Sequence, residues 1–250
     1  MNDTPRRQLD LSGTVAVVTG GTRGVGLAIT RKLISCGVDV VAGYRRDDLA
    51  AKHLETAYGE RVTTVAADLT SPTGLARLLA AARQRYGRID VFVHAAGTLH
   101  AMSALGIDPA GVEADVRLAL VPLLGASAIA ELMADGGRII VISSHGARVA
   151  APRYVSAGIA KAAAESLVRY LAVELAGRGI AVNAVSTAKI DKGSHTPNPE
   201  IGEQLAARTP GGRLTTPEDV ANVVALLCTP EAGWIHGQVI TVDGGLSVRG

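Results

Sequence analysis

Short runs of β-branched residues alternate with longer amphipathic segments rich in Ala and Leu along most of the chain. Such alternation is typical of repeated strand–helix–strand units around a parallel sheet. Runs such as VAVV and RIIVI are apolar at consecutive positions, which indicates that helices cover both faces of the sheet. The pattern predicts strands at Val15–Thr19, Val38–Gly43, Val62–Ala66, Val91–Ala95, Arg138–Ser143, Ala181–Val185 and Val239–Val242.

The amphipathic segments between these strands predict helices near residues 25–36, 48–58, 72–86, 110–134, 153–178 and 217–229. Pro122 interrupts the longest apolar pattern, and we expect a kink there. Nothing in the composition marks a boundary between two domains. We therefore expect an N-terminal tail at 1–12 and one Rossmann-type, doubly wound α/β domain at 13–250, with a seven-stranded parallel sheet flanked by helices.

A segment at 187–212 departs from this regularity. It carries Pro197, Pro199 and Pro210 among polar residues, and it follows the carboxyl end of a predicted strand. Doubly wound sheets bind their ligands at that edge, so we interpret the segment as a mobile substrate lid. The alternative is a tolerated surface insertion.

Composition and charge narrow the function classes. Hydrophobic residues make up 48% of the chain, and 25 basic against 23 acidic side chains leave a net charge of +2 without a basic run, so we expect no nucleic-acid partner. No stretch approaches the ~18 uninterrupted apolar residues of a membrane span, and we expect a soluble, cytoplasmic protein without a membrane partner. Cys36 and Cys228 are too few and too far apart to indicate a disulfide framework or a metal site.

The first predicted strand runs directly into TGGTRGVG, with Gly20, Gly24 and Gly26 ahead of an amphipathic segment. Glycines at these places allow a tight turn, close approach of the backbone to a pyrophosphate and close packing of helix on strand. The exposed N–H groups at the start of the helix then receive the anion. A nucleotide site is the favoured interpretation over a structural glycine turn.

The residues after the second predicted strand indicate which nucleotide binds. An NAD site places an acidic residue there to accept from the ribose hydroxyls, whereas this chain has Tyr44, Arg45 and Arg46. With Arg23 in the glycine loop, these guanidinium groups favour a 2′-phosphate and therefore NADP(H). The alternative is a pair of surface arginines at a helix start. Asp68, after the third strand, is either a partner of the adenine edge or a helix cap.

Several motifs in order resemble the short-chain dehydrogenase/reductase family over essentially the whole chain. They are TGGTRGVG at 19–26, AADL at 66–69, HAAG at 94–97 in place of the family's Asn-Asn-Ala-Gly, VISS at 141–144, VNAVS at 182–186 and VDGG at 242–245. The resemblance implies hydride transfer between nicotinamide and a small substrate, a catalytic Tyr and Lys on the helix after the fifth strand, and a homotetramer. Carried onto this chain, it predicts a cofactor site at Gly20, Thr22, Arg23, Gly24, Val25, Gly26, Tyr44, Arg45, Arg46, Asp68, Leu69, Ala95, Ala96, Gly97, Lys161 and Ile190.

Tyr154 and Lys161 are the residues that match the catalytic pair, and six residues lie between them. Most of the family has three. On a regular helix the wider spacing separates the two Cα atoms by ~10 Å along the axis, against ~6 Å for the usual spacing. The wider spacing resembles the enoyl-acyl-carrier-protein reductases of this superfamily. The runs RYLAVEL, ARTPGGR and GQVITVDGG are similar to their NADPH-dependent bacterial branch.

The chemistry agrees with this resemblance. Enoyl reduction leaves negative charge on the thioester oxygen, so Tyr154 serves as a hydrogen-bond donor and does not need a close Lys to lower its pKa. No Asn occurs between Gly97 and Val182, where ordinary members of the family carry the Asn of a proton relay. Ser144 or Ser143 is expected to touch the substrate oxygen, or else to be an inert serine at a strand end. Lys189, Lys192 and His195 put basic groups on the predicted lid, either as a solvated surface or against an anionic carrier.

The sequence therefore predicts an NADPH-dependent reductase of an enoyl thioester, linked to acyl carrier protein or coenzyme A, in fatty acid or polyketide metabolism. Tyr154, Lys161 and Ser144 are the predicted catalytic residues, and no metal is expected. Two alternatives stay open. One is a ketoreductase or alcohol dehydrogenase on the same scaffold, and the other is a catalytically silent NADP(H)-binding subunit, suggested by the missing Asn and the altered HAAG.

Overall fold

Seven parallel strands form one sheet in a computed structural model that describes residues 9–71, 73–134, 136–196 and 199–248. The strand order is β3-β2-β1-β4-β5-β6-β7. Successive strands are therefore added towards one edge of the sheet from β1 to β3, and towards the other edge from β4 onward. Ligands of doubly wound sheets bind beside such a reversal of the strand order, at the carboxyl ends of the strands. The strands are β1 (Val15–Thr19), β2 (Asp39–Tyr44), β3 (Val62–Ala66), β4 (Val91–His94), β5 (Gly137–Ser144), β6 (Ile180–Thr187) and β7 (Val239–Val242).

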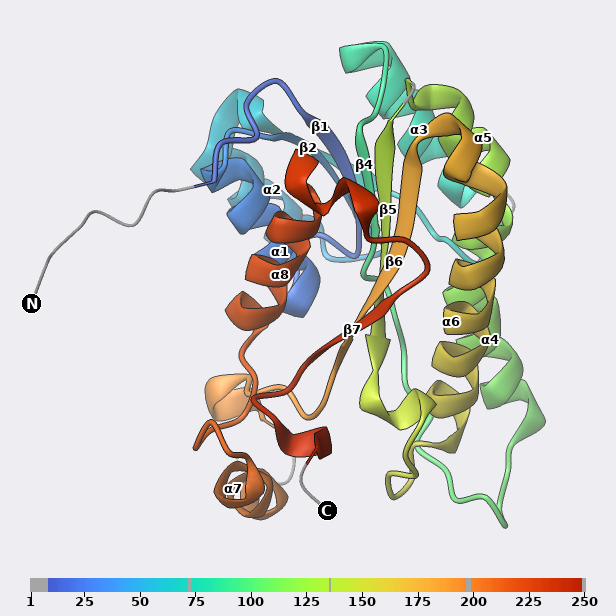
Figure 1. Ribbon diagram of the computed structural model, residues 1–250, viewed down its shortest axis with the longest axis vertical. Coiled ribbons are helices and arrows are strands. Elements are labelled where there is room, and N and C mark those ends of the chain that lie inside the picture. Colours follow the sequence, from blue (N-terminus) through green and yellow to red (C-terminus); the bar gives the residue numbers. More distant parts are fainter. Residues whose placement is uncertain (1–8, 72, 135, 197–198, 249–250) are drawn as a thin grey trace, which may run out of the picture.

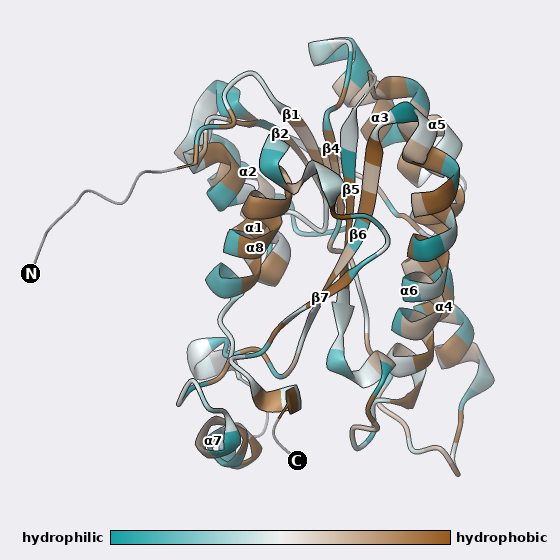
Figure 2. Ribbon diagram, viewed as in Figure 1, coloured by the Kyte–Doolittle hydropathy of each residue, from teal (hydrophilic) through white to brown (hydrophobic). Residues whose placement is uncertain are grey.

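Helices cover both faces of the sheet (Figure 1). On one face lie α1 (Gly24–Ser35), α2 (Asp48–Tyr58) and α8 (Pro217–Leu227), and on the other lie α3 (Gly74–Tyr86), α4 (Pro109–Leu124), α5 (Ala126–Leu132) and α6 (Val155–Leu175). Each face has its own apolar cluster, because neighbouring residues of a strand point to opposite sides: Val17 belongs to one cluster, Ala16 and Val18 to the other. Figure 2 shows the apolar residues gathered along the strands and the adjoining helix faces.

The predicted fold is confirmed, with most element ends displaced by at most a few residues. The ranges of β1, β3, β7 and α2 agree with the sequence pattern at both ends. The expected single helix at 110–134 is wrong in one respect, because α4 and α5 are separate helices. The helix is interrupted at Gly125, whereas Pro122 lies inside α4. A Cβ at Gly125 would come within 2.3 Å of the Leu75 side chain.

The segment predicted as a lid contains a helix that the prolines concealed. Helix α7 spans Pro199–Arg208, and Pro199 is its first residue, a position where a missing N–H costs nothing. Pro197 lies outside the described residues. The segment after α7 is anchored, since Gly211 N donates to Gly244 O at 3.0 Å and Thr209 is buried. In Figure 1, α7 lies at the end of the sheet where β6 and β7 finish.

The end of the predicted N-terminal tail belongs to the domain. Leu11 is buried, and its N–H donates to Cys36 O at 2.7 Å, at the end of α1. Cys36 and Cys228 are both free thiols, and burial raises the pKa of Cys228 to about 12. Within the described part of the chain, no helix has both the length and the apolar character that crossing a membrane requires.

Candidate active site

The loop between β1 and α1 leaves the start of that helix open. Gly20 and Gly24 adopt left-handed backbone angles, with φ of 66° and 52°, which glycine tolerates best. A Cβ at Gly26 would lie 2.1 Å from Gly20 O, so only glycine permits the helix to approach the strand this closely. Helix α1 has no side-chain cap and no acidic residue in its first turn. Its first N–H groups are therefore available to an anion.

Basic side chains follow β2 beside this loop. Arg45 and Arg46 are exposed, and Tyr44 donates its hydroxyl to Asp48 Oδ1 at 2.8 Å. Asp68 faces the two arginines: hydrogen bonds from Thr70 chiefly lower its pKa, and the positive charges of both arginines lower it further. The capping alternative for Asp68 is wrong, because Thr73 precedes α3 at the N-cap and Asp68 instead accepts from Thr70 N and Oγ1.

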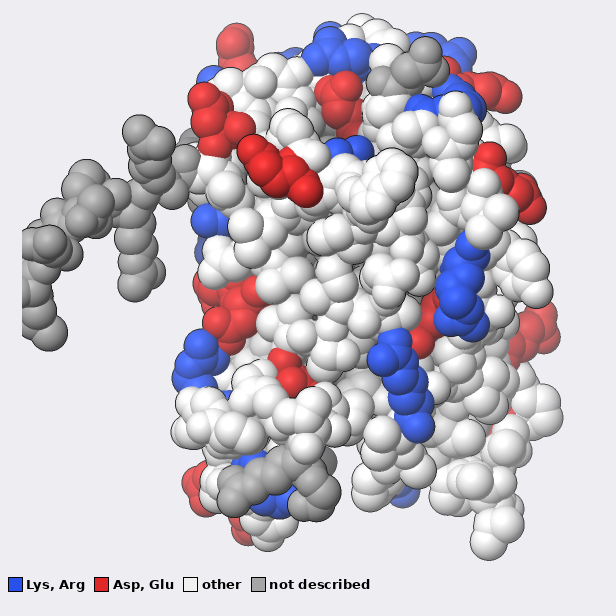
Figure 3. Space-filling view, viewed as in Figure 1, with Lys and Arg blue, Asp and Glu red and all other residues white. Residues whose placement is uncertain are grey.

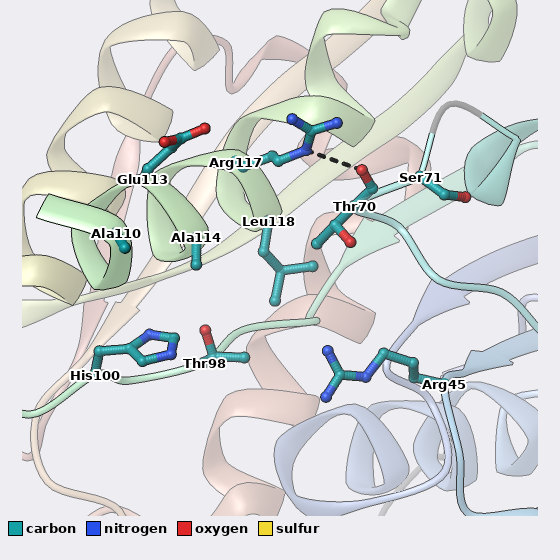
Figure 4. A pocket seen from close by; sticks show the side chains of 10 residues that line it. All are labelled: Arg45, Thr70, Ser71, Thr98, His100, Ala110, Glu113, Ala114, Arg117 and Leu118. Atoms are coloured by element: carbon teal, nitrogen blue, oxygen red, sulfur yellow. Dashed lines mark hydrogen bonds between the residues drawn. The ribbon is translucent and has the colours of Figure 1, made fainter.

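A cleft of about 630 Å³ opens next to these arginines (Figure 4). Arg45 borders it on one side and helix α4 on the other. Arg117, on α4, donates from Nε to Thr70 O at 2.9 Å. The lining residues are Arg45, Thr70, Ser71, Thr98, His100, Ala110, Glu113, Ala114, Arg117 and Leu118. The cleft therefore connects the end of β2 to the segment after β4.

A buried hydrogen-bond chain fixes the segment after β4. Thr19 Oγ1 accepts from Ala95 N and Ala96 N at 3.1 and 3.2 Å, which leaves its own proton for His94 Nδ1 at 2.8 Å. His94 Nε2 must then carry the ring proton and donate to Leu118 O at 3.2 Å. Burial, and then the charge of Lys161, lower the pKa of His94 to about 3, so the ring is neutral.

Tyr154 lies outside the regular part of α6. It is the N-cap residue, with φ −112° and ψ 10°, and its carbonyl accepts from Gly158 N at 2.8 Å. The expected ~10 Å separation from Lys161 along the axis therefore still applies to the Cα atoms, while the Tyr154 side chain departs from the helical direction. Arg153, just before it, has φ 58°, a left-handed conformation that is uncommon for a non-glycine residue. The loop before α6 therefore sets the direction of the Tyr154 side chain, and the helix sets that of Lys161.

Two glycines allow the Tyr154 ring to lie against the short 3₁₀ turn at 145–147. A Cβ at Gly146 would come within 2.4 Å of the ring, and a Cβ at Gly158 would come within 2.7 Å of Gly146 O. The first turn of α6 and the 3₁₀ turn are thus in backbone contact. Any side chain at Gly146 would displace the phenol ring.

Lys161 lies two turns into α6 and points to the ends of the central strands. Its Nζ donates to Ile142 O at 2.7 Å, and a Cβ on Gly97 would lie 3.6 Å from Nζ. Burial lowers the pKa of Lys161 to about 8, and the negative charge of Asp115 opposes this shift. The structure thus brings Lys161 to the segment that follows β4.

The two serines at the end of β5 have different surroundings. Ser143 is buried and donates to Glu165 Oε1 at 2.6 Å, so its proton is not available to a ligand. Ser144 is half-buried, and its Oγ accepts from Gly146 N at 3.2 Å. Ser144 pairs in register with Thr187 of β6, whose buried Oγ1 has no hydrogen-bond partner among the described residues.

Ile190, three residues beyond β6, is held in place by a backbone bridge to Thr215. Its side chain packs against the apolar cluster on the α1 and α8 face. Thr187 was missed in the sequence, because a threonine at a strand end carries no distinguishing signal. Together, Ser144, Thr187 and Ile190 border the carboxyl ends of β5 and β6.

Asp115 is the polar residue that sequence reasoning overlooked. It is buried on α4 and accepts from Thr98 Oγ1, Ser156 Oγ, His100 N at 3.0 Å and His100 Nδ1 at 2.8 Å. Burial alone would raise the pKa of Asp115, but these donors outweigh it and the pKa lies below its ordinary value. The available signal was a carboxylate within the apolar stripe of that predicted helix.

Comparisons with known proteins identify the relatives of this chain. A family model described as Enoyl-(Acyl carrier protein) reductase matches residues 20–247. The chain is 36% identical to 1-cyclohexenylcarbonyl-CoA reductase of Streptomyces collinus, across 99% of the chain and 92% of that protein.

Solved structures show the same fold. The reductase LugOII, described as promiscuous and as catalysing keto-reduction at C1 during lugdunomycin biosynthesis, has a TM-score of 0.88 at 31% identity, over 95% of this chain and 99% of that one. A blue fluorescent protein from a metagenomic library, in complex with NADPH, has a TM-score of 0.86 at 30% identity, with the same coverage. With its glycine loop, parallel sheet and Tyr–Lys pair, the chain belongs to the short-chain dehydrogenase/reductase family of oxidoreductases.

Proposed function

We propose that the protein is an NADPH-dependent reductase of enoyl thioesters. The observation that carries the proposal is the position of Tyr154, which precedes α6 while Lys161 lies within it. This arrangement separates the phenol donor from the lysine by about two helical turns. The 36% identity to a reductase of an unsaturated acyl-CoA supports the same reaction.

The cofactor would lie across the carboxyl ends of β1, β2, β4 and β6. The open start of α1, with Gly20, Thr22, Gly24, Val25 and Gly26 in its loop, suits the pyrophosphate. Tyr44, Arg45, Arg46 and Arg23 are the candidates for the adenosine 2′-phosphate. The proposed adenine and ribose contacts are Asp68, Leu69, Ala95, Ala96 and Gly97, and Lys161 would hold the nicotinamide ribose.

The end of the proposed cofactor site where the nicotinamide would lie contains a polar group suited to its carboxamide. Thr187 Oγ1 is buried without a partner among the described residues, and a carboxamide would satisfy it. Ile190 would pack beside that group. These side chains would present one face of the nicotinamide ring to the substrate.

The residues then divide the chemistry between them. Bound NADPH supplies the hydride, which enters at the β-carbon of the substrate. As the carbon–carbon double bond opens, charge develops on the thioester oxygen, and Tyr154 donates a hydrogen bond to it. Ser144 is the second candidate contact to that oxygen. Lys161, charged below about pH 8, adds positive potential nearby, and the α-carbon takes its proton from solvent water.

Parallel assays test the proposal. The purified protein is given NADPH with crotonyl-CoA and with acetoacetyl-CoA, and loss of NADPH and the acyl products are measured. We expect turnover of the crotonyl thioester, reduced in Tyr154→Phe by roughly 100-fold, the usual cost of one oxyanion donor. Turnover of the ketone alone would reject the enoyl assignment. Acyl-carrier-protein substrates in the same assay identify the carrier.

A second candidate function, ketone reduction, is favoured by the likeness to LugOII. It requires Tyr154 to give up its proton and not only a hydrogen bond. With the ketone as substrate, proton transfer from the phenol in the rate-limiting step would slow turnover in heavy water.

A further inference from the structure

Asp115 connects two parts of the active site that are far apart in sequence. Its Oδ1 accepts from Thr98 Oγ1 and His100 Nδ1, on the segment after β4. Its Oδ2 accepts from His100 N and from Ser156 Oγ, on the first turn of α6. Asp115 and Ser156 are both buried, with 3% and 0% exposure. One carboxylate therefore ties the segment 98–102 to the start of the helix that follows Tyr154.

Three further contacts join the same two segments around Tyr154. Met102 and Tyr154 form a parallel backbone bridge. Arg153 donates to Ala101 O at 3.2 Å, and Ser156 Oγ also lies 3.2 Å from His100 O. The residues on both sides of Tyr154 are thus held by the segment after β4.

The wide Tyr–Lys spacing puts Tyr154 at the N-cap of α6, so its side chain has to be oriented by contacts outside the helix. A tyrosine inside a helix is oriented by the helix, but Tyr154 follows a left-handed residue and has non-helical angles. Such a conformation persists only when neighbouring structure determines it. We propose that Asp115 is a positioning residue, which fixes the Tyr154 phenol through Ser156 and the segment 98–102. The inference rests on the role proposed for Tyr154 in catalysis.

Each carboxylate oxygen of Asp115 accepts two hydrogen bonds, so substitution can test the effect of these bonds separately from the effect of the negative charge. In Asp115→Asn, the amide oxygen can accept from His100 N and Ser156, while the amide nitrogen donates to Thr98 Oγ1 and to an unprotonated His100 Nδ1. All four contacts are then rebuilt without the negative charge. Asp115→Ala removes both.

The first test is a double-mutant cycle on the full-length protein, with whichever thioester it reduces. At about pH 6.5, where Lys161 is charged, Asp115→Ala should lower kcat by roughly 10- to 100-fold, the cost of a small misplacement of a catalytic group, with the NADPH KM nearly unchanged. Asp115→Asn should stay within about threefold of the wild type, because its hydrogen bonds are rebuilt. In a Tyr154→Phe background, Asp115→Ala should cost almost nothing, because the group it positions is gone. Ser156→Ala should behave like a weaker Asp115→Ala.

Asp108→Ala is the matched control. Asp108 caps the same helix, and its carboxylate accepts from Ala110 N and Gly111 N within the first turn of α4. The substitution should lower the melting temperature and leave kcat unchanged. Equal losses of kcat from Asp115→Ala in the wild-type and Tyr154→Phe backgrounds would overturn the positioning role.

Hydrogen exchange measured by mass spectrometry tests the inference without a substrate. Asp115→Ala should speed exchange at 100–102 and 153–158, whereas Asp108→Ala should speed it only at the start of α4. If Tyr154→Phe leaves kcat unchanged, the catalytic role proposed for Tyr154 is wrong. The exchange rates at 153–158 still test whether Asp115 holds this segment in place. Unchanged exchange at 153–158 in Asp115→Ala would overturn the inference in either case.

Discussion

The hydroxyl of Thr19, the last residue of β1, donates to Nδ1 of buried His94, the last residue of β4, across 2.8 Å. The bond joins the two neighbouring parallel strands between which the strand order of the sheet reverses. His94 stands where the family usually has Asn, and it performs a structural task at neutral charge. A neutral buried histidine also has a consequence for stability.

The first prediction concerns acid stability. The pKa of His94 is about 3 in the folded protein, against an ordinary value of 6.5 for an exposed histidine. Between these values the unfolded chain binds more protons, so stability should fall as pH falls from 6.5 towards 3. His94→Asn should reduce this slope by about 1.4 kcal/mol per pH unit. Urea unfolding of both proteins from about pH 4 to 7 measures it, and identical slopes would refute the prediction.

A second prediction follows from Lys161, whose pKa is about 8. Below that pH the ammonium is charged, and above it the charge is lost. NADPH should therefore bind more weakly as pH rises through about 8, which a fluorescence titration measures. Lys161→Met should bind weakly at every pH. Because the unfolded chain retains this proton up to 10.5, the same group should increase stability with pH between about 8 and 10.5.

Cofactor choice gives a third prediction. Exchanging Arg45 and Arg46 for Asp and Ala should weaken NADPH by roughly 100-fold, the worth of two charge-assisted hydrogen bonds, and leave NADH little affected. Calorimetric titration with both dinucleotides measures the difference. Arg83→Ala, in the last turn of α3, serves as the charge control. An equal loss for both dinucleotides would show that the arginines have another role.

The contact of Gly146 with the Tyr154 ring gives a fourth prediction. A methyl group at Gly146 would lie within 2.4 Å of the phenol ring, so Gly146→Ala should move the ring and lower kcat by about 10-fold or more. NADPH affinity should stay unchanged. Gly177→Ala is the control, since nothing lies within 4 Å of a Cβ there. Equal kcat in the two variants would contradict the ring placement.

A fifth prediction concerns assembly as a homotetramer. Figure 3 shows a broad uncharged area over the centre of the face in front of α8 and β7. Exposed apolar residues on α8 and on the turns that flank β7 include Leu226 at 52%, Trp234 at 96% and Val248 at 86%. Patches of this kind mark interfaces. Trp234→Glu should reduce the mass measured by light scattering, whereas Leu49→Glu on α2 should not, and a monomeric wild type would refute the prediction.

The fold was predictable because the chain alternates between short apolar runs typical of buried strands and longer amphipathic segments typical of helices. Consecutive apolar residues in β1 required helices on both faces, and the glycines before α1 marked the loop that leaves a helix start open. The contact that requires glycine at position 125 was not predictable, because it is made by the Leu75 side chain, which is distant in sequence. Likewise, Pro199 suggested a broken segment, although proline at a first helical position is compatible with α7.

The candidate site was predictable in its residue types and less so in its geometry. Tyr154 and Lys161 were evident from their spacing, but no sequence signal marks Arg153 as left-handed. Asp115 was missed because the expected polar residue on that helix was Asn. A charged residue in a buried stripe acquires meaning only once its partners, here Ser156 and His100, are known.

The separation of Tyr154 from the body of α6 affects how such an enzyme can change its substrate. Residues 149–152 of the loop before α6 should be the ones that vary with the least effect on Lys161, because Gly146, Arg148 and Arg153 contact other parts of the site. Variation confined to that loop would shift the point at which an oxygen is recognised while the hydride source stays fixed. One scaffold could in this way explore acceptors of different shape, and directed evolution of this protein would best begin there.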